Sequence, residues 1–113
     1  MVSQNEFSDD TQFRLAVEEI LSCLLDQIDE IDADFDPRLS GANLSITYED
    51  GSVLMLSQQT PTHELWLSAN YTAWHFRRAE GIWIERDTAA PMTQVLNQII
   101  SDKIGITVNL SLQ

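Results

Sequence analysis

The sequence predicts an α+β fold, a two-layer α/β sandwich in which an antiparallel sheet of about five or six strands is covered on one face by N- and C-terminal helices. Apolar residues recur at helical spacing near both ends of the chain, and apolar and polar residues alternate in between. The connections between the alternating segments are short, which favours antiparallel pairing. A chain of 113 residues, 43% of them hydrophobic, fits one domain, and we expect this domain to span residues 1–113.

An amphipathic helix is expected first. Its apolar residues recur at spacings of three and four and predict one packed face: Phe13, Val17, Ile20, Leu21, Leu24, Ile28 and Ile31. Its acidic residues fall on the opposite face: Glu18, Glu19, Asp26, Asp29 and Glu30. Ser8, Asp9, Asp10 or Thr11 is expected to cap the start of the helix. Asp29 and Glu30 oppose the helix dipole at its end.

A short edge strand is expected over residues 32–39, where the period of the pattern changes from that of a helix to that of a strand. The alternation predicts three carboxylates on one side of this strand: Asp32, Asp34 and Asp36. Pro37 cannot donate a ladder hydrogen bond, so the strand is expected at the sheet edge. Alternation resumes over residues 44–48, and Asp50 with Gly51 predicts a hairpin into residues 53–57.

Three further strands are expected over residues 64–69, 73–77 and 82–86. Asp87 or Thr88, together with Pro91, signals the start of a second helix that ends at Gly105. The apolar stripe of this helix is expected to contain Met92, Val95, Leu96, Ile99, Ile100 and Ile104. The tail, residues 106–113, is apolar enough to pack back onto the fold.

Charge excludes some classes of partner. Eighteen acidic against six basic residues give a formal net charge of −12, the wrong sign for binding a nucleic-acid backbone or an anionic membrane surface. Residues 1–36 hold eleven acidic residues against Arg14 alone, a net charge of −10. Because nearby bases are missing, these carboxylates repel one another until a cation or a basic partner meets them.

The candidate metal ligands are therefore eight carboxylates: Glu18, Glu19, Asp26, Asp29, Glu30, Asp32, Asp34 and Asp36. Oxygen ligands suit hard cations such as Mg²⁺, Ca²⁺, Mn²⁺ and iron, and they discriminate poorly among them. The spacing does not match an EF-hand loop, so we expect loose binding at several places. The competing interpretation is a solvated helix face that only keeps the protein soluble.

Several other chemistries find no support in the sequence. It contains none of the glycine-rich phosphate-binding motifs and no Glu-x-x-His pair of the di-iron type, and we expect no enzymatic activity. The single cysteine, Cys23, is expected to be a small buried residue, and His63 and His75 are expected to be structural. No segment approaches the roughly 20 apolar residues of a membrane span, so we expect a soluble, cytoplasmic protein.

Trp66 is a candidate for partner binding. It alternates with Leu65 and Leu67, so it lies on the opposite face of the strand from these two leucines. If the leucines face the helices, Trp66 faces outward on an open sheet, where a large aromatic side chain suits a partner contact. The alternative is a different register in which Trp66 belongs to the core.

Taken together, these residues resemble the frataxin family, and specifically its bacterial members. The resemblance covers nearly the whole chain: an acidic first helix, the segments ITYEDGS and QQTPTHELWLSA, then WHF, GIWIE and a second helix. Its most specific motif is Gln59-x-Pro61 followed by Trp66-Leu67, placed after the Asp50-Gly51 hairpin. The sequence departs from the family at Ser57 and Gln58, where an Asn and a basic residue are common, and at Arg38, where an acid is often found.

The resemblance implies a protein that binds iron weakly through exposed carboxylates and takes part in iron-sulfur cluster assembly. It implies two partners, a cysteine desulfurase and an iron-sulfur scaffold protein, and a monomer in the absence of iron. Gln59 and Trp66 match the sheet contact of the family. Six of the carboxylates, flanked by Glu18 and Glu19, match its acidic ridge: Asp26, Asp29, Glu30, Asp32, Asp34 and Asp36. The alternative, from a different functional class, is an acidic protein-interaction module in which metal binding is incidental.

Overall fold

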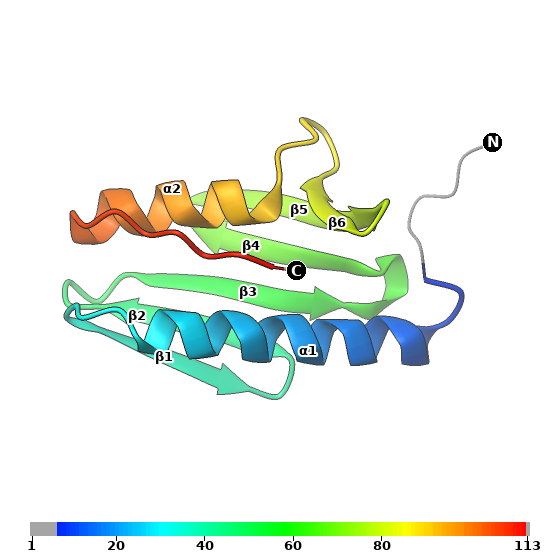
Figure 1. Ribbon diagram of the computed structural model, residues 1–113, viewed down its shortest axis with the longest axis horizontal. Helices are drawn as coiled ribbons and strands as arrows, with labels where there is room; N and C mark the ends of the chain where they lie inside the picture. Colours follow the sequence, from blue (N-terminus) through cyan, green and yellow to red (C-terminus); the bar gives the residue numbers. More distant parts are fainter. Residues whose placement is uncertain (1–6, 113) are drawn as a thin grey trace.

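The computed structural model describes residues 7–112; residues 1–6 and Gln113 of the predicted domain lie outside the described residues. Two helices cover one face of a six-stranded antiparallel sheet with strand order β1-β2-β3-β4-β5-β6 (Figure 1). This arrangement confirms the predicted fold class. Each strand pairs with its neighbour in the sequence, so the sheet is a simple meander.

Helix α1 spans Asp10–Asp29, close to the prediction. Asp9 caps its start, because its side chain accepts a hydrogen bond of 2.9 Å from the backbone N–H of Gln12. The buried stripe contains five of the seven predicted apolar residues: Phe13, Val17, Leu21, Leu24 and Ile28. Ile20 and Ile31 are partly buried at its borders.

The strands are β1 Phe35–Ser40, β2 Asn43–Tyr48, β3 Val53–Gln59, β4 Glu64–Ala69, β5 Thr72–Ala79 and β6 Ile82–Glu85, with a 3-10 turn at Thr60–Thr62. β1 is an edge strand and contains Pro37, as predicted. The predicted start of this strand is wrong, because pairing begins at Phe35 opposite Tyr48. Asp32 and Asp34 therefore lie in the loop before the sheet, and of the three predicted carboxylates Asp36 alone belongs to the strand.

Helix α2 spans Met92–Ile104 and ends at Gly105, whose φ of 73° is a left-handed conformation that suits glycine. The predicted cap residues do not cap it. Pro91 occupies the capping position, while Asp87 and Thr88 instead donate hydrogen bonds to the carboxylate of Glu85. The turn before α2 is thus organised around a buried carboxylate.

The tail packs back as predicted. Residues 106–112 run between α1 and α2 on the helical side of the sheet (Figure 1, red), and Val108 and Leu110 are buried. The Asn97 side chain bonds both backbone groups of Leu110, and Gln27 of α1 does the same for Ser111. The tail therefore completes the core between the helices.

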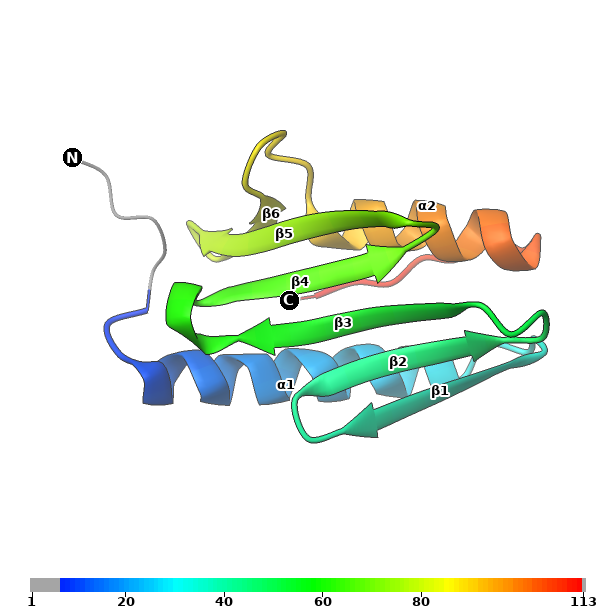
Figure 2. The ribbon, with the colours of Figure 1, turned by 180° about the vertical axis from the view of Figure 1, so that it is seen from behind.

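The opposite face of the sheet carries no helix (Figure 2). We call it the outer face. Within residues 7–112, no helix is both long enough and apolar enough to cross a lipid bilayer.

Candidate functional site

The eight predicted carboxylates are all exposed, and we call them the acidic ridge: Glu18, Glu19, Asp26, Asp29, Glu30, Asp32, Asp34 and Asp36. They follow the solvent side of α1 and continue through the loop into β1. At 1.5 Å of rise per residue, Glu18 and Asp29 lie about 16 Å apart along the helix axis. The ridge is therefore an extended strip of charge rather than a single ligand cage.

The end of α1 carries an electrostatic cost. Asp29 is the last helical residue, Glu30 is its C-cap, and the last turn contains no basic residue. Two carboxylates at the negative end of the helix dipole are each unfavourable by about 0.3 to 1 kcal/mol. A cation or a basic partner at this end would relieve that repulsion.

A groove of about 450 Å³ lies beside this end of the ridge. Asp32 and Asp34 line it together with Asp50 and Lys103. The Lys103 ammonium donates to the Asp50 carboxylate at 2.6 Å and, with hydrogen bonds from Ser52, holds the pKa of Asp50 well below its usual range. The groove thus contains one cation of the protein itself, and this cation engages Asp50 rather than the ridge.

Tyr48 also lines this groove, as a neutral phenol. Burial, and secondarily the charge of Asp50, raises the pKa of Tyr48 to about 12. The Lys103 ammonium lies 5.4 Å from the centre of its ring. Tyr48 therefore offers no anionic oxygen at neutral pH, and the carboxylates remain the ligands available to a metal.

The expectation that the ridge lacks nearby bases is wrong at one position. Arg38 donates from Nε to the Asp36 carboxylate at 2.8 Å, although both side chains are largely exposed. Within residues 7–112, the other seven ridge carboxylates form no ion pair. The departure at Arg38 therefore neutralises the β1 end of the ridge.

In the part of the chain that the structure describes, no three His, Cys, Asp or Glu side chains converge on a point that could hold a metal ion. Glu19 is further separated from the loop acids, because it lines a different cavity, facing β6 and α2. An ion on the ridge would therefore meet one or two carboxylates and water. Such sites bind hard cations weakly.

The predicted orientation of Trp66 is confirmed. Leu65 and Leu67 are fully buried against the helices, whereas Trp66 is 38% exposed on the outer face. Gln59 pairs with Glu64 across the β3–β4 ladder, and Ser57 pairs with Trp66, so both predicted partner-binding residues lie on this face. Val53 and Met55 add exposed apolar area on β3 of the same face.

Three residues that the sequence analysis missed hold Trp66 in place. Its indole N–H donates to the carboxylate of Glu64 at 2.9 Å, and Arg86 donates to the same oxygen at 3.4 Å. His75 contacts the indole edge-on, with ring centres 4.6 Å apart. Glu64 is buried although it lies on the outer face. Its carboxylate is stabilised there by the two hydrogen bonds from Trp66 and Arg86. Strand alternation could have identified Glu64, two residues before Trp66 in β4, and His75, opposite Trp66 in β5. It could not have identified Arg86, which lies in the turn after β6.

Two other expectations have different outcomes. Cys23 is exposed rather than buried, and the amide of Gln27 lies 3.3 Å from its sulfur. His63 is structural as expected, since it stacks on Phe13 with ring centres 4.8 Å apart and lies 2.8 Å from the Asp10 carboxylate. It joins the start of α1 to the β3–β4 connection.

Comparison with known proteins finds relatives along most of the chain. The family described as Frataxin-like domain matches residues 6–106. The chain is 32% identical over 102 residues to the iron-sulfur cluster assembly protein CyaY of Neisseria meningitidis serogroup C, covering 90% of this chain and 95% of that protein. It is 26% identical over 100 residues to the CyaY protein of Pseudoalteromonas atlantica, covering 88% and 93%.

Solved structures agree on the fold. A frataxin from Psychromonas ingrahamii superposes with a TM-score of 0.85 at 23% identity, covering 92% of this chain and 99% of that one. A trimeric frataxin from the yeast Saccharomyces cerevisiae, described as complexed with ferrous iron, superposes with a TM-score of 0.70 at 17% identity, covering 92% and 93%.

Proposed function

Since this chain belongs to the frataxin-like family, we propose that it acts in iron-sulfur cluster assembly, binding iron weakly and modulating a cysteine desulfurase and its scaffold protein as a regulator or an iron donor. The observation that carries the proposal is the acidic ridge, in which seven exposed carboxylates form no ion pair within residues 7–112. The names of the CyaY relatives, which are iron-sulfur cluster assembly proteins, support a role in this process.

In this proposal the ridge holds iron as cargo. Carboxylate oxygens suit ferrous and ferric ions, and the spread of the ligands along α1 and its following loop favours exchange with other divalent cations. No three ligands converge among the described residues, which supports several weak sites. The named ferrous complex of a fold relative is consistent with iron as the ion.

Metal titration gives a direct prediction. Fe²⁺, under anaerobic conditions, Co²⁺ and Mn²⁺ should bind with affinities within about tenfold of one another, because exposed carboxylates offer no soft donor that selects among them. Calorimetry and NMR line broadening would measure affinity and place the ions. A matched control is Cys23→Ser, which should bind all three ions as the unmodified chain does. Coordination through Cys23 or a histidine would contradict the prediction.

The proposed partners meet the protein at two surfaces. The ridge steers and binds a basic surface on the desulfurase, since seven unpaired carboxylates attract cationic side chains as well as metal ions. The outer face, with Gln59 and Trp66, contacts the scaffold protein. Trp66 suits this role because an exposed aromatic side chain held by Glu64 and His75 pays little ordering cost on binding.

Substituting Trp66 separates binding from folding. Trp66→Ala should lower the free energy of unfolding by about 1 to 2 kcal/mol, below the roughly 3 to 5 kcal/mol of a buried tryptophan, because the indole is partly exposed. It should weaken partner binding by about 2 kcal/mol. Leu65→Ala is the matched control on the inner face of the same strand: it should cost about 2 to 5 kcal/mol of stability and leave affinity of the folded protein unchanged. Denaturant unfolding and calorimetry would measure both.

Retention of the partners tests the proposal. Immobilised protein, incubated with native extract of the source organism, should retain the cysteine desulfurase and the scaffold protein. The alternative function, an acidic interaction module with incidental metal binding, is favoured by the absence of a convergent ligand set among the described residues. It predicts retention of other basic proteins without the desulfurase, and that outcome would overturn the proposal.

A further inference from the structure

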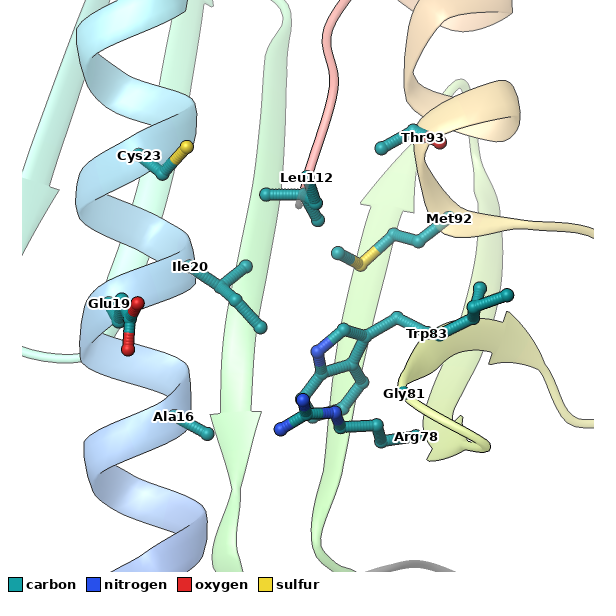
Figure 3. Close-up of a pocket in the computed structure, with 11 residues that line it drawn as sticks. Ala16, Glu19, Ile20, Cys23, Arg78, Gly81, Trp83, Met92, Thr93 and Leu112 are labelled. Atoms are coloured by element: carbon teal, nitrogen blue, oxygen red, sulfur yellow. The ribbon is translucent and has the colours of Figure 1, made fainter.

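A cavity of about 170 Å³ opens on the helical side of the molecule, away from the outer face. One wall is the first half of α1, with Ala16, Glu19 and Ile20 (Figure 3). The facing wall combines Trp83 of β6 and Met92 at the start of α2. The cavity is comparable in size to engineered cavities of about 150 Å³ that bind benzene.

The indole of Trp83 gives this cavity a polar anchor. Trp83 is 96% buried, and among the residues that the structure describes its Nε1 atom is buried without a hydrogen-bond partner. Figure 3 shows this nitrogen turned across the cavity towards α1. A buried donor without an acceptor is destabilising, so native structures pair such groups with protein, water or ligand. An acceptor atom inside the cavity would satisfy the indole N–H of Trp83.

The remaining lining sets the chemistry of the occupant. Ile20, Met92 and Leu112 supply apolar surface around the indole. The lining also carries two opposite charges, the carboxylate of Glu19 and the guanidinium of Arg78, which offset each other. The net charge of −12 on the protein then disfavours an anionic ligand. An uncharged molecule with a compact apolar body and one carbonyl oxygen satisfies both the walls and the donor.

We propose that this cavity is a binding site for a small neutral carbonyl compound, which places its oxygen on the indole N–H of Trp83 and its apolar body between α1 and α2. The site shares Glu19 with the acidic ridge but uses neither Trp66 nor the loop carboxylates, so its occupancy can be tested separately from the proposed role in cluster assembly. Cys23, exposed on the rim of the cavity, provides a chemical reporter of its occupancy.

Benzamide is the probe, because it joins a benzene-sized body to a neutral carbonyl group. In NMR spectra of the ¹⁵N-labelled full chain without metal, benzamide should shift the Trp83 indole N–H signal downfield and saturably, and the Trp66 indole signal should not follow. Occupancy should also slow alkylation of Cys23. Toluene, which lacks the acceptor, should bind at least fivefold more weakly, as expected for one lost hydrogen bond. Benzoate should also bind more weakly, because its negative charge is disfavoured by the net charge of the protein.

Two variants complete the test. Trp83→Phe keeps an aromatic ring without the donor and should weaken benzamide binding about fivefold. Ala16→Phe fills the cavity while leaving the donor in place and should abolish binding, so the proposal remains testable if Trp83→Phe does not fold. An unchanged Trp83 signal up to the solubility limit of benzamide, equal binding of toluene, or tighter binding of benzoate would overturn it.

Discussion

Replacing Glu85 with alanine should lower the free energy of unfolding by about 3 kcal/mol at neutral pH, because three backbone N–H groups lose their common acceptor. The Glu85 carboxylate is buried and accepts from the backbone of Asp87 at 2.8 Å, Thr88 at 3.0 Å and His75 at 3.2 Å. These bonds hold the β5–β6 ladder to the turn before α2. Denaturant unfolding would measure the loss, and Glu80→Ala, on the exposed β5–β6 turn, should change stability by less than about 0.5 kcal/mol.

The contribution of Glu85 should also depend on pH. Burial alone would raise the pKa of Glu85, but the hydrogen bonds from Asp87, His75 and Thr88 outweigh it and hold this pKa below its ordinary value of 4.5. A carboxyl group with a lowered folded-state pKa stabilises fully above the unfolded-state pKa and loses that stabilisation as pH falls through the folded-state pKa. The difference in the free energy of unfolding between the unmodified chain and Glu85→Ala should therefore become smaller as the pH falls below about 4.5. A difference that stays constant down to acid unfolding would contradict this account.

Reversing two charges of the acidic ridge, Asp29→Lys with Glu30→Lys, should weaken both metal binding and desulfurase binding by tenfold or more, equivalent to about 1.4 kcal/mol or more each. The change removes two ligands and places two cations where a basic surface would approach. It should not unfold the protein, because lysines at the C-terminal end of α1 interact favourably with the helix dipole. Calorimetric titrations with Fe²⁺ and with purified desulfurase would measure both losses.

The matched control is Glu80→Lys with Asp87→Lys. Both residues are exposed and lie at the β6 end of the sheet, away from Asp29 and Glu30 at the end of α1. This pair makes the same change in net charge, so it tests whether the effect depends on position. Equal weakening by the two double variants would assign binding to net charge alone and would contradict a specific role of the ridge.

The periodicity of the sequence predicted most of the fold. Helical spacing identified both α-helices and alternation identified all six strands, because buried faces of helices and strands recur with distinct periods. The 3-10 turn at Thr60–Thr62 was not predicted. The prediction of the start of β1 was wrong because the alternating pattern begins before the paired part of the strand. Alternation from Asp32 to Leu39 reads as one strand, yet the ladder begins at Phe35, since pairing depends on the position of Tyr48 in the partner strand.

The sequence predicted the position of a candidate site residue only where the local pattern of the strand or helix determines which way its side chain faces. Alternation places Trp66 opposite Leu65 and Leu67 without knowledge of any partner residue. The pairing of Lys103 with Asp50 could not be predicted, because 53 residues separate the two in the chain. The exposure of Cys23 was missed for a similar reason, since its burial depends on how closely β6 and α2 approach α1, and a cavity lies there.

The most direct test of the central claim is the rate of iron-sulfur cluster formation on the scaffold protein, measured with cysteine desulfurase, cysteine, reductant and Fe²⁺ in the presence and absence of this protein. The account predicts that the unmodified chain changes this rate. Asp29→Lys with Glu30→Lys should abolish most of the change, and the control Glu80→Lys with Asp87→Lys should preserve it. A rate that is the same with and without the protein, or that responds equally to both double variants, would contradict the account.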